Sequence, residues 1–193
     1  MKGAERNRHL APKDVLDGQK VRLRPPRVDE FPFIRALWGD PDTMASVGGP
    51  VDFPESKARE WFRRMVEPGG ASDCYCLVLN EDDVPVGEIS FHHWDAEQRS
   101  ADLNVKILAV SRGHGYGRDA LRTFLEFFFG RVGGHFMTDD VALKNRAGQQ
   151  LLASMGFEKN DRVSDVFRMT LTRQMYLERY GEPGQGLNDR ARL

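Results

Sequence analysis

Apolar and polar residues change their spacing several times along the chain, and these changes predict alternating strands and helices. Residues 21–24 alternate apolar and charged side chains, which is typical of a half-buried strand, and Pro25-Pro26 ends it. Two segments then repeat apolar residues every three or four positions, as amphipathic helices do. The first follows an N-cap at Asp29 and ends at Gly39-Asp40-Pro41; the second follows Pro54.

The middle of the chain predicts a hairpin and then a third strand. Tyr75–Asn80 and Val84–His92 flank the turn Glu81-Asp82-Asp83, and Ala101–Val110 again alternates apolar and polar residues. Four elements follow: a helix over Gly115–Phe129, a strand over Phe136–Leu143, a helix over Asn145–Met155 and a strand over Phe167–Leu171, before a short helix through Tyr176. This order predicts an α+β domain over residues 20–180 with one mixed, mostly antiparallel sheet. Residues 1–19 read as a poorly ordered lead-in and 181–193 as a polar tail.

Composition narrows the class of protein. The 193 residues carry 28 Lys and Arg against 29 Asp and Glu, a net charge of -1 that gives no bulk attraction to nucleic acid or anionic membranes. No apolar run approaches the roughly 18 residues of a membrane span, and residues 1–20 lack the apolar core of a signal peptide. Cys74 and Cys76 fit neither a redox pair nor a zinc half-site. We therefore expect a cytoplasmic protein with no nucleic-acid or membrane partner, acting as a monomer or homodimer.

A glycine-rich turn carries the strongest chemical signal. The strand Ala101–Val110 runs into Arg112-Gly113-His114-Gly115-Tyr116-Gly117 and then into the long helix. Glycines at such a junction let backbone N–H groups approach an anion, and the helix N-terminus and Arg112 add positive charge. The turn therefore predicts a pyrophosphate site, with a plain connecting turn as the alternative. A dinucleotide fingerprint would need glycine where Arg118 stands, and the Gly-Lys-Ser/Thr of a P-loop is missing.

The motif Arg112-x-x-Gly115-x-Gly117 resembles the Q/R-x-x-G-x-G/A signature of the GNAT superfamily of N-acetyltransferases. Val86-Gly87-Glu88-Ile89, Ala101-Asp102-Leu103, and Asn145 followed by Leu151–Phe157 are similar to further family segments, in the family's order. Val21–Pro25 and Asp40-Pro41-Asp42 resemble the RimJ/RimL branch. The resemblance covers about Lys20–Tyr180 and implies the GNAT fold, with the sheet splayed beside the CoA-binding strand and helices on both faces.

The resemblance also implies acetyl-CoA as co-substrate, with no metal. Backbone groups of Ile107 and Ala109 would pair with pantetheine, an amide near Leu108 would meet the oxyanion, and Asn145 would bond the pantetheine arm or serve as an ordinary N-cap. Amides from Arg112 through Arg118 would wrap the pyrophosphate. The implied cofactor-binding residues are Ile107, Leu108, Ala109, Arg112, Gly113, His114, Gly115, Tyr116, Gly117, Arg118 and Asn145.

Acyl transfer needs a neutral amine, and a lysine-like amine is neutral in only about one molecule in 2500 at pH 7. Asp102 is the candidate general base, through a water, because many relatives carry Glu at the matching position; a solvated strand residue is the alternative. The family often places a Tyr acid seven residues after the helix-start Asn, but Leu152 stands there. Ser154 is the candidate acid, although a thiolate can also leave unaided and Ser154 can be a helix-end residue.

Acidic residues suggest the nature of the acceptor. The loop Gly39–Phe53 carries Asp40, Asp42 and Asp52 without Lys or Arg, and Asp95 and Glu97 follow His92-His93-Trp94. Such a cleft would attract a cation, although the carboxylates can also be solvated loop surface. His92 and His93 are adjacent on a strand and so point to opposite faces, which argues against a shared metal; one of them can face the acceptor. The predicted function is acetyl transfer to a peptide N-terminus or small cationic amine, with an idle acyl-CoA-binding sensor or scaffold as the alternative.

Overall fold

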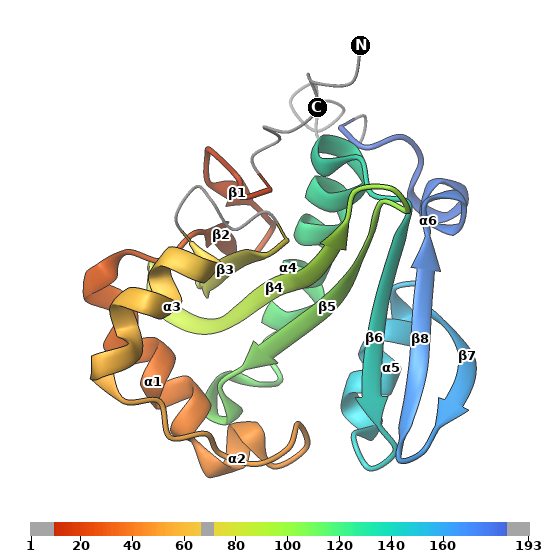
Figure 1. The fold of residues 1–193 in the computed structure, drawn as a ribbon. Helices are drawn as coiled ribbons and strands as arrows, with labels where there is room; N and C mark the ends of the chain where they lie inside the picture. The colour runs from red at the N-terminus through yellow and green to blue at the C-terminus, as the bar shows by residue number, and fades with distance from the viewer. Residues whose placement is uncertain (1–9, 67–71, 185–193) are drawn as a thin grey trace.

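The strands of the computed structural model, which describes residues 10–66 and 72–184, form one sheet in the order β1-β2-β3-β4-β5-β6-β8-β7 (Figure 1). Neighbouring strands are antiparallel except β5 and β6, which are parallel. The strand bounds are β1 Leu16–Asp17, β2 Arg22–Arg24, β3 Cys74–Leu79, β4 Pro85–Asp95, β5 Ser100–Ile107, β6 Phe136–Ala142, β7 Glu158–Val163 and β8 Val166–Thr172. This confirms the predicted α+β class and mixed sheet.

Helices cover both faces of the sheet (Figure 1). On one face, α1 and α3 pack Phe31, Ile34 and Trp61 against Tyr75 and the other side chains of β3 that share its face. On the opposite face, α4, α5 and α6 bury a larger apolar cluster that includes both free cysteines, Cys74 and Cys76. The helix bounds are α1 Phe31–Gly39, α2 Pro41–Met44, α3 Ala58–Met65, α4 Tyr116–Glu126, α5 Arg146–Ser154 and α6 Arg173–Tyr180. A π-helical turn, Phe127–Val132, prolongs α4.

Three short elements differ from the sequence-based prediction. Residues 10–19 were expected to be poorly ordered, yet Leu10 and Leu16 are buried and β1 pairs with β2; residues 1–9 lie outside the described part of the chain. The break at Gly39-Asp40-Pro41 is followed at once by α2, because Asp40 accepts a hydrogen bond from the Thr43 amide at 2.7 Å and caps it. Strand β7 was missed because its polar sequence shows no apolar alternation.

The sheet divides where β5 and β6 separate. Only Ser100, Ala101 and Asp102 pair with β6, opposite Phe136, Met137 and Thr138. Beyond that point β5 stays paired with β4 as far as Ile107 and β6 stays paired with β8 as far as Ala142, so the sheet opens between them (Figure 1). This confirms the predicted splay. Trp38, near the end of α1, and Met44, at the end of α2, lie at this opening.

Within residues 10–66 and 72–184, no helix combines the length and apolar character needed to cross a membrane.

Candidate active site

The opening between β5 and β6 contains a cleft of about 670 Å³, here called the interstrand cleft. One wall is β5, the other is β6 with the start of α5, and Trp38 and residues near α2 close one end. The residues that line the cleft include Trp38, Val51, His92, Asp102, Val105, Lys106, Asp139, Asp140, Lys144, Asn145, Leu152 and Asp165. The cleft thus brings together β5, the residues that precede α5 and the carboxylates of β6.

The glycine turn lies between the end of β5 and α4. Gly113 and Gly115 both adopt left-handed backbone conformations, with φ of 85° and 87°, which disfavour any residue with a Cβ. Gly115 is the N-cap of α4, so the positive end of an 11-residue helix faces the turn. Within the described part of the chain, the amides of residues 113–118 donate to no acceptor. The turn is therefore a preformed set of free donors suited to an anion.

Arg112 differs from the expectation that it reaches phosphate. Its Nη2 donates to the Thr43 carbonyl at 2.9 Å and its Nε to the Ile107 carbonyl at 3.2 Å. The Thr43 hydroxyl in turn accepts from the Ala109 amide at 2.9 Å. In this structure the guanidinium therefore ties α2 to the end of β5, and the free donors of the turn are its backbone amides.

The Leu108 amide, expected near the oxyanion, is also engaged, because it donates to the Val86 carbonyl of β4 at 2.9 Å. Amides along a strand alternate between its two edges. Since the Leu108 amide points towards β4, those of Val105 and Ile107 point to the opposite, open edge of β5, where Val105 lines the interstrand cleft. These are the strand donors that remain for a ligand.

Asp102 lies at the point where the strands separate, and both carboxylate oxygens have partners. His93 Nδ1 lies 2.9 Å from Oδ2, and the Thr138 hydroxyl donates to Oδ1 at 2.6 Å. His93 occupies a β-bulge with a φ of 55°, a strained conformation for a residue with a side chain. The Asp102 side chain remains 58% exposed. The carboxylate is thus oriented by two neighbours while it stays open to water.

His92 belongs to a separate chain of polar contacts. Its Nδ1 lies 3.0 Å from Asp73 Oδ1, and its Nε2 lies 3.1 Å from the hydroxyl of the buried Ser90. The two histidines therefore contact different carboxylates. His92 is the one that lines the interstrand cleft. Among the residues that the structure describes, no three His, Cys, Asp or Glu side chains form a metal-binding group.

The two remaining predicted site residues, Asn145 and Ser154, lie at opposite ends of α5. Asn145 lines the cleft and also caps the helix, accepting from the Gly148 amide at 2.9 Å. Leu152 lines the cleft, whereas Ser154 does not. The Ser154 hydroxyl donates to the Leu151 carbonyl at 2.7 Å, as helix-end serines commonly do. The position of Ser154 therefore supports the structural reading over the acid role.

The sequence analysis missed two carboxylates, Glu88, which is buried beside the cleft, and Asp139, which lines it. Glu88, fully buried, accepts hydrogen bonds from Trp38 Nε1 at 2.7 Å, from Lys106 Nζ at 2.6 Å and from the Tyr75 hydroxyl. Burial raises the pKa of the half-buried Asp139 to about 7; the charges of Asp140 and Asp102 add to the rise and Lys106 opposes it. Alternation alone gave no signal for either, because a polar residue in a strand pattern is ordinarily expected to face solvent.

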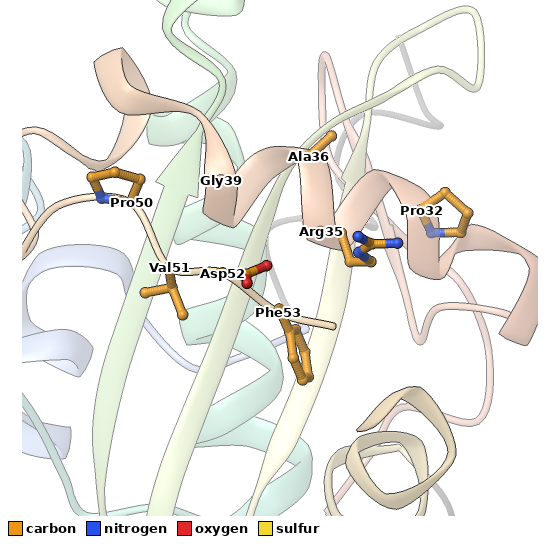
Figure 2. Close-up of a pocket in the computed structure, with 8 residues that line it drawn as sticks. All are labelled: Pro32, Arg35, Ala36, Gly39, Pro50, Val51, Asp52 and Phe53. Atoms are coloured by element: carbon orange, nitrogen blue, oxygen red, sulfur yellow. The ribbon is translucent and has the colours of Figure 1, made fainter. Parts of the chain in front are cut away.

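The acidic residues of the 39–53 loop do not line the interstrand cleft; from this loop only Met44, Ser46, Val47, Gly48 and Val51 do. Asp52 instead borders a separate hollow of about 630 Å³ between α1 and residues 50–53, opposite Arg35 (Figure 2). Arg35 also pairs with Glu55 at 3.2 Å. This hollow holds none of the predicted site residues. The carboxylates of the cleft come from β5, β6 and the β7–β8 turn instead.

Comparison with known proteins places this geometry in a family. The family model described as the acetyltransferase (GNAT) domain matches residues 20–158. The fold is similar to spermidine N-acetyltransferase from Vibrio cholerae in complex with CoA and spermine, with a TM-score of 0.73 and 20% identity over 82% of this chain and 98% of that chain. A GNAT-family acetyltransferase from Bacillus anthracis gives a TM-score of 0.69 and 14% identity over 83% of this chain and 99% of that chain. No curated protein matches the sequence.

The structural similarities lie below 25% identity and so establish the fold, whereas the family match spans most of the chain, including β5, the glycine turn and α5. The chain belongs to the acetyltransferase (GNAT) domain family.

Proposed function

We propose that the protein transfers an acetyl group from acetyl-CoA to a small cationic primary amine by direct attack on the thioester. One observation supports the proposal above all: the open strand edge of β5 leads directly into the free backbone amides of residues 113–118. An extended pantetheine arm fits an open strand edge, and a pyrophosphate fits the free amides.

In this proposal the pantetheine pairs with the inward-facing backbone of Val105 and Ile107, beside Asn145. The pyrophosphate lies over Gly113–Gly117, where an added Cβ at Gly113 would meet nothing within 4 Å. The amide of Val105 or Ile107 takes the oxyanion role expected of Leu108. Asp102 accepts the amine proton through a water, held in place by His93 and Thr138.

The charges of the cleft favour a cationic acceptor. Four carboxylates line it, those of Asp102, Asp139, Asp140 and Asp165, against the cations Lys106 and Lys144. Glu88 neutralises Lys106, and Arg168 pairs with Asp140 through two hydrogen bonds of 2.8 Å. The remaining balance is negative, which favours a cation. The name of one similar structure includes spermine, which supports a small amine over a peptide N-terminus.

The alternative is an idle acyl-CoA-binding sensor, favoured by Leu152 at the usual acid position. The experiment that separates the two measures free-thiol release from acetyl-CoA with polyamines, a peptide with a free N-terminus and anionic amines. We expect turnover with the polyamines, and a kcat/KM that falls as salt screens the cleft. Equal rates for cationic and anionic amines would contradict the charge argument, and CoA binding without thiol release would favour the sensor.

Two finer assignments belong to the same proposal. The opening Val21–Pro25 and the run Asp40-Pro41-Asp42 support the RimJ/RimL branch within the family. A monomer or homodimer remains the proposed assembly, although one similar spermidine N-acetyltransferase is described as dodecameric. Sedimentation at working concentration tests the assembly.

A further inference from the structure

The Asp139 carboxylate is unpaired and faces the interstrand cleft. It accepts no hydrogen bond from any residue in the described part of the chain, and no fully buried side-chain oxygen there lacks a partner. The half-buried Asp139 carboxylate must therefore be open to the cleft. Met137 and Val141, two positions away on either side, are buried in the same cluster as Leu152 of α5. Since alternate residues share one face of a strand, Asp139 lies on the Leu152 side of β6.

Burial raises the pKa of Asp139, and the charged groups around it modify the shift. From β5 these are Asp102 and Lys106, and from its own strand Asp140, which is itself paired with Arg168 of β8. Beyond them His92, Lys144 and Asp165 line the same cleft. Because burial raises its pKa to about 7, the protonated form of Asp139 is populated at neutral pH.

The proposed reaction needs a proton donor in this cleft. When the C–S bond breaks, the departing thiolate has a conjugate thiol with a pKa of about 8.5, so an acid near pKa 7 donates to it downhill. Leu152 has no proton to give, and Ser154 lies outside the cleft with its hydroxyl bound to the Leu151 carbonyl.

We propose that Asp139 is the catalytic acid that protonates the CoA thiolate. This inference rests on the proposed function. The amine nitrogen forms the new C–N bond, and Asp102 takes a nitrogen proton through water. The tetrahedral intermediate then expels sulfur, which accepts the Asp139 proton and leaves as free thiol. Asp139 regains a proton from the one released at Asp102, so the net reaction is amine plus thioester giving amide plus thiol.

The test compares two donors with different leaving groups. S-phenyl thioacetate releases a thiolate that is stable enough to leave unaided, whereas acetyl-CoA benefits from an acid. Asp139→Asn should lower kcat with acetyl-CoA by about a hundredfold and change the rate with S-phenyl thioacetate by less than about threefold. Asp102→Asn, which acts before sulfur leaves, should reduce both rates alike. Asp139→Glu keeps the acid and should restore much of the rate with acetyl-CoA.

The pH profile supplies an independent readout. With acetyl-CoA the wild-type kcat should fall as pH rises above about 7, and this limb should be absent in Asp139→Asn. Equal losses with both donors in a variant that still binds CoA would overturn the acid role. A wild-type protein that releases no thiol with any amine would instead overturn the proposed function, and this inference with it.

Discussion

At the scale of single residues, Asp102 shows how the site combines orientation with access. A carboxylate that accepts from both His93 and Thr138 is fixed in direction, yet its 58% exposure leaves room for a relayed water. Asp is one methylene shorter than Glu, and His93 and Thr138 orient this shorter side chain. The strained bulge at His93 is the local cost of placing an imidazole there.

Asp102→Asn should lower turnover at pH 7 by roughly ten- to a thousandfold, because the amide cannot accept the amine proton. The loss should shrink at high pH, where the amine deprotonates without help. The measurement is kcat against pH with one amine acceptor. Asp83→Asn, in the β3–β4 turn outside the cleft and paired with Arg22, is the control for charge removal. A loss of the same size at every pH would mean that Asp102 is structural.

At the scale of elements, the glycine turn binds through its backbone, so its function depends on φ and on empty space. Gly115 has the αL conformation that begins α4, and an added Cβ there would lie 3.4 Å from Lys20 Nζ. Lys20 also donates to the His114 carbonyl at 3.0 Å and thereby holds the outer side of the turn. The strand β5, the turn and α4 therefore act as one binding element.

Gly115→Glu should abolish acetyl-CoA binding in calorimetry, because it strains the turn and adds a negative charge beside the phosphates. Gly181→Glu is the matched control. Gly181 also has a positive φ, 76°, and an added Cβ there would meet nothing within 4 Å. Its ψ of -171° lies in a region that glycine almost alone adopts, so the substitution should cost about 1–3 kcal/mol of stability and leave binding unchanged. Wild-type affinity in a folded Gly115→Glu protein would refute the placement of the pyrophosphate.

Elements with a local sequence signal could be predicted, whereas elements that depend on tertiary contacts could not. The hairpin, β5, the glycine turn and α4 were predicted because their periodicity and glycines are local signals. The short α2 depends on one Asp40–Thr43 cap, and β7 depends on pairing with β8, so neither has a periodic pattern of its own. Asp40, Asp42 and Asp52 were wrongly expected in the cleft, because the composition of a loop does not show which way its side chains point. Asp139 became noticeable only once burial and the neighbouring charges were known.

At the scale of the whole molecule, the unpaired Asp139 weakens the fold that surrounds it. The carboxyl has a pKa of about 3.9 in an unfolded chain and about 7 in the folded protein. Between these values the folded protein binds more protons than the unfolded one, so stability falls as pH rises from about 4 to 7. Above pH 7 the full cost of the buried charge is present; below pH 4 it is absent.

Asp139→Asn carries no charge at any pH and should therefore stabilise the protein at pH 8, by about 1–2 kcal/mol. The gain should diminish as pH falls and vanish near pH 4. Denaturant unfolding at pH 4, 6 and 8 measures it, with Asp83→Asn as the reference for an exposed carboxylate. A variant less stable than wild type at pH 8 would mean that the carboxylate has a stabilising partner.

The contacts of Thr43 have a consequence for how mutants of this enzyme are interpreted. One buried residue accepts from the Ala109 amide at the end of β5 and from Arg112 in the glycine turn, while its own amide is held by Asp40 at the start of α2. Removing the Arg112 guanidinium therefore takes away one of the two ties between α2 and the end of β5. An Arg112 variant that binds CoA poorly is no proof of a phosphate contact, because the position of α2 is weakened in the same step. Affinities for the two substrates should consequently be measured separately in any such variant.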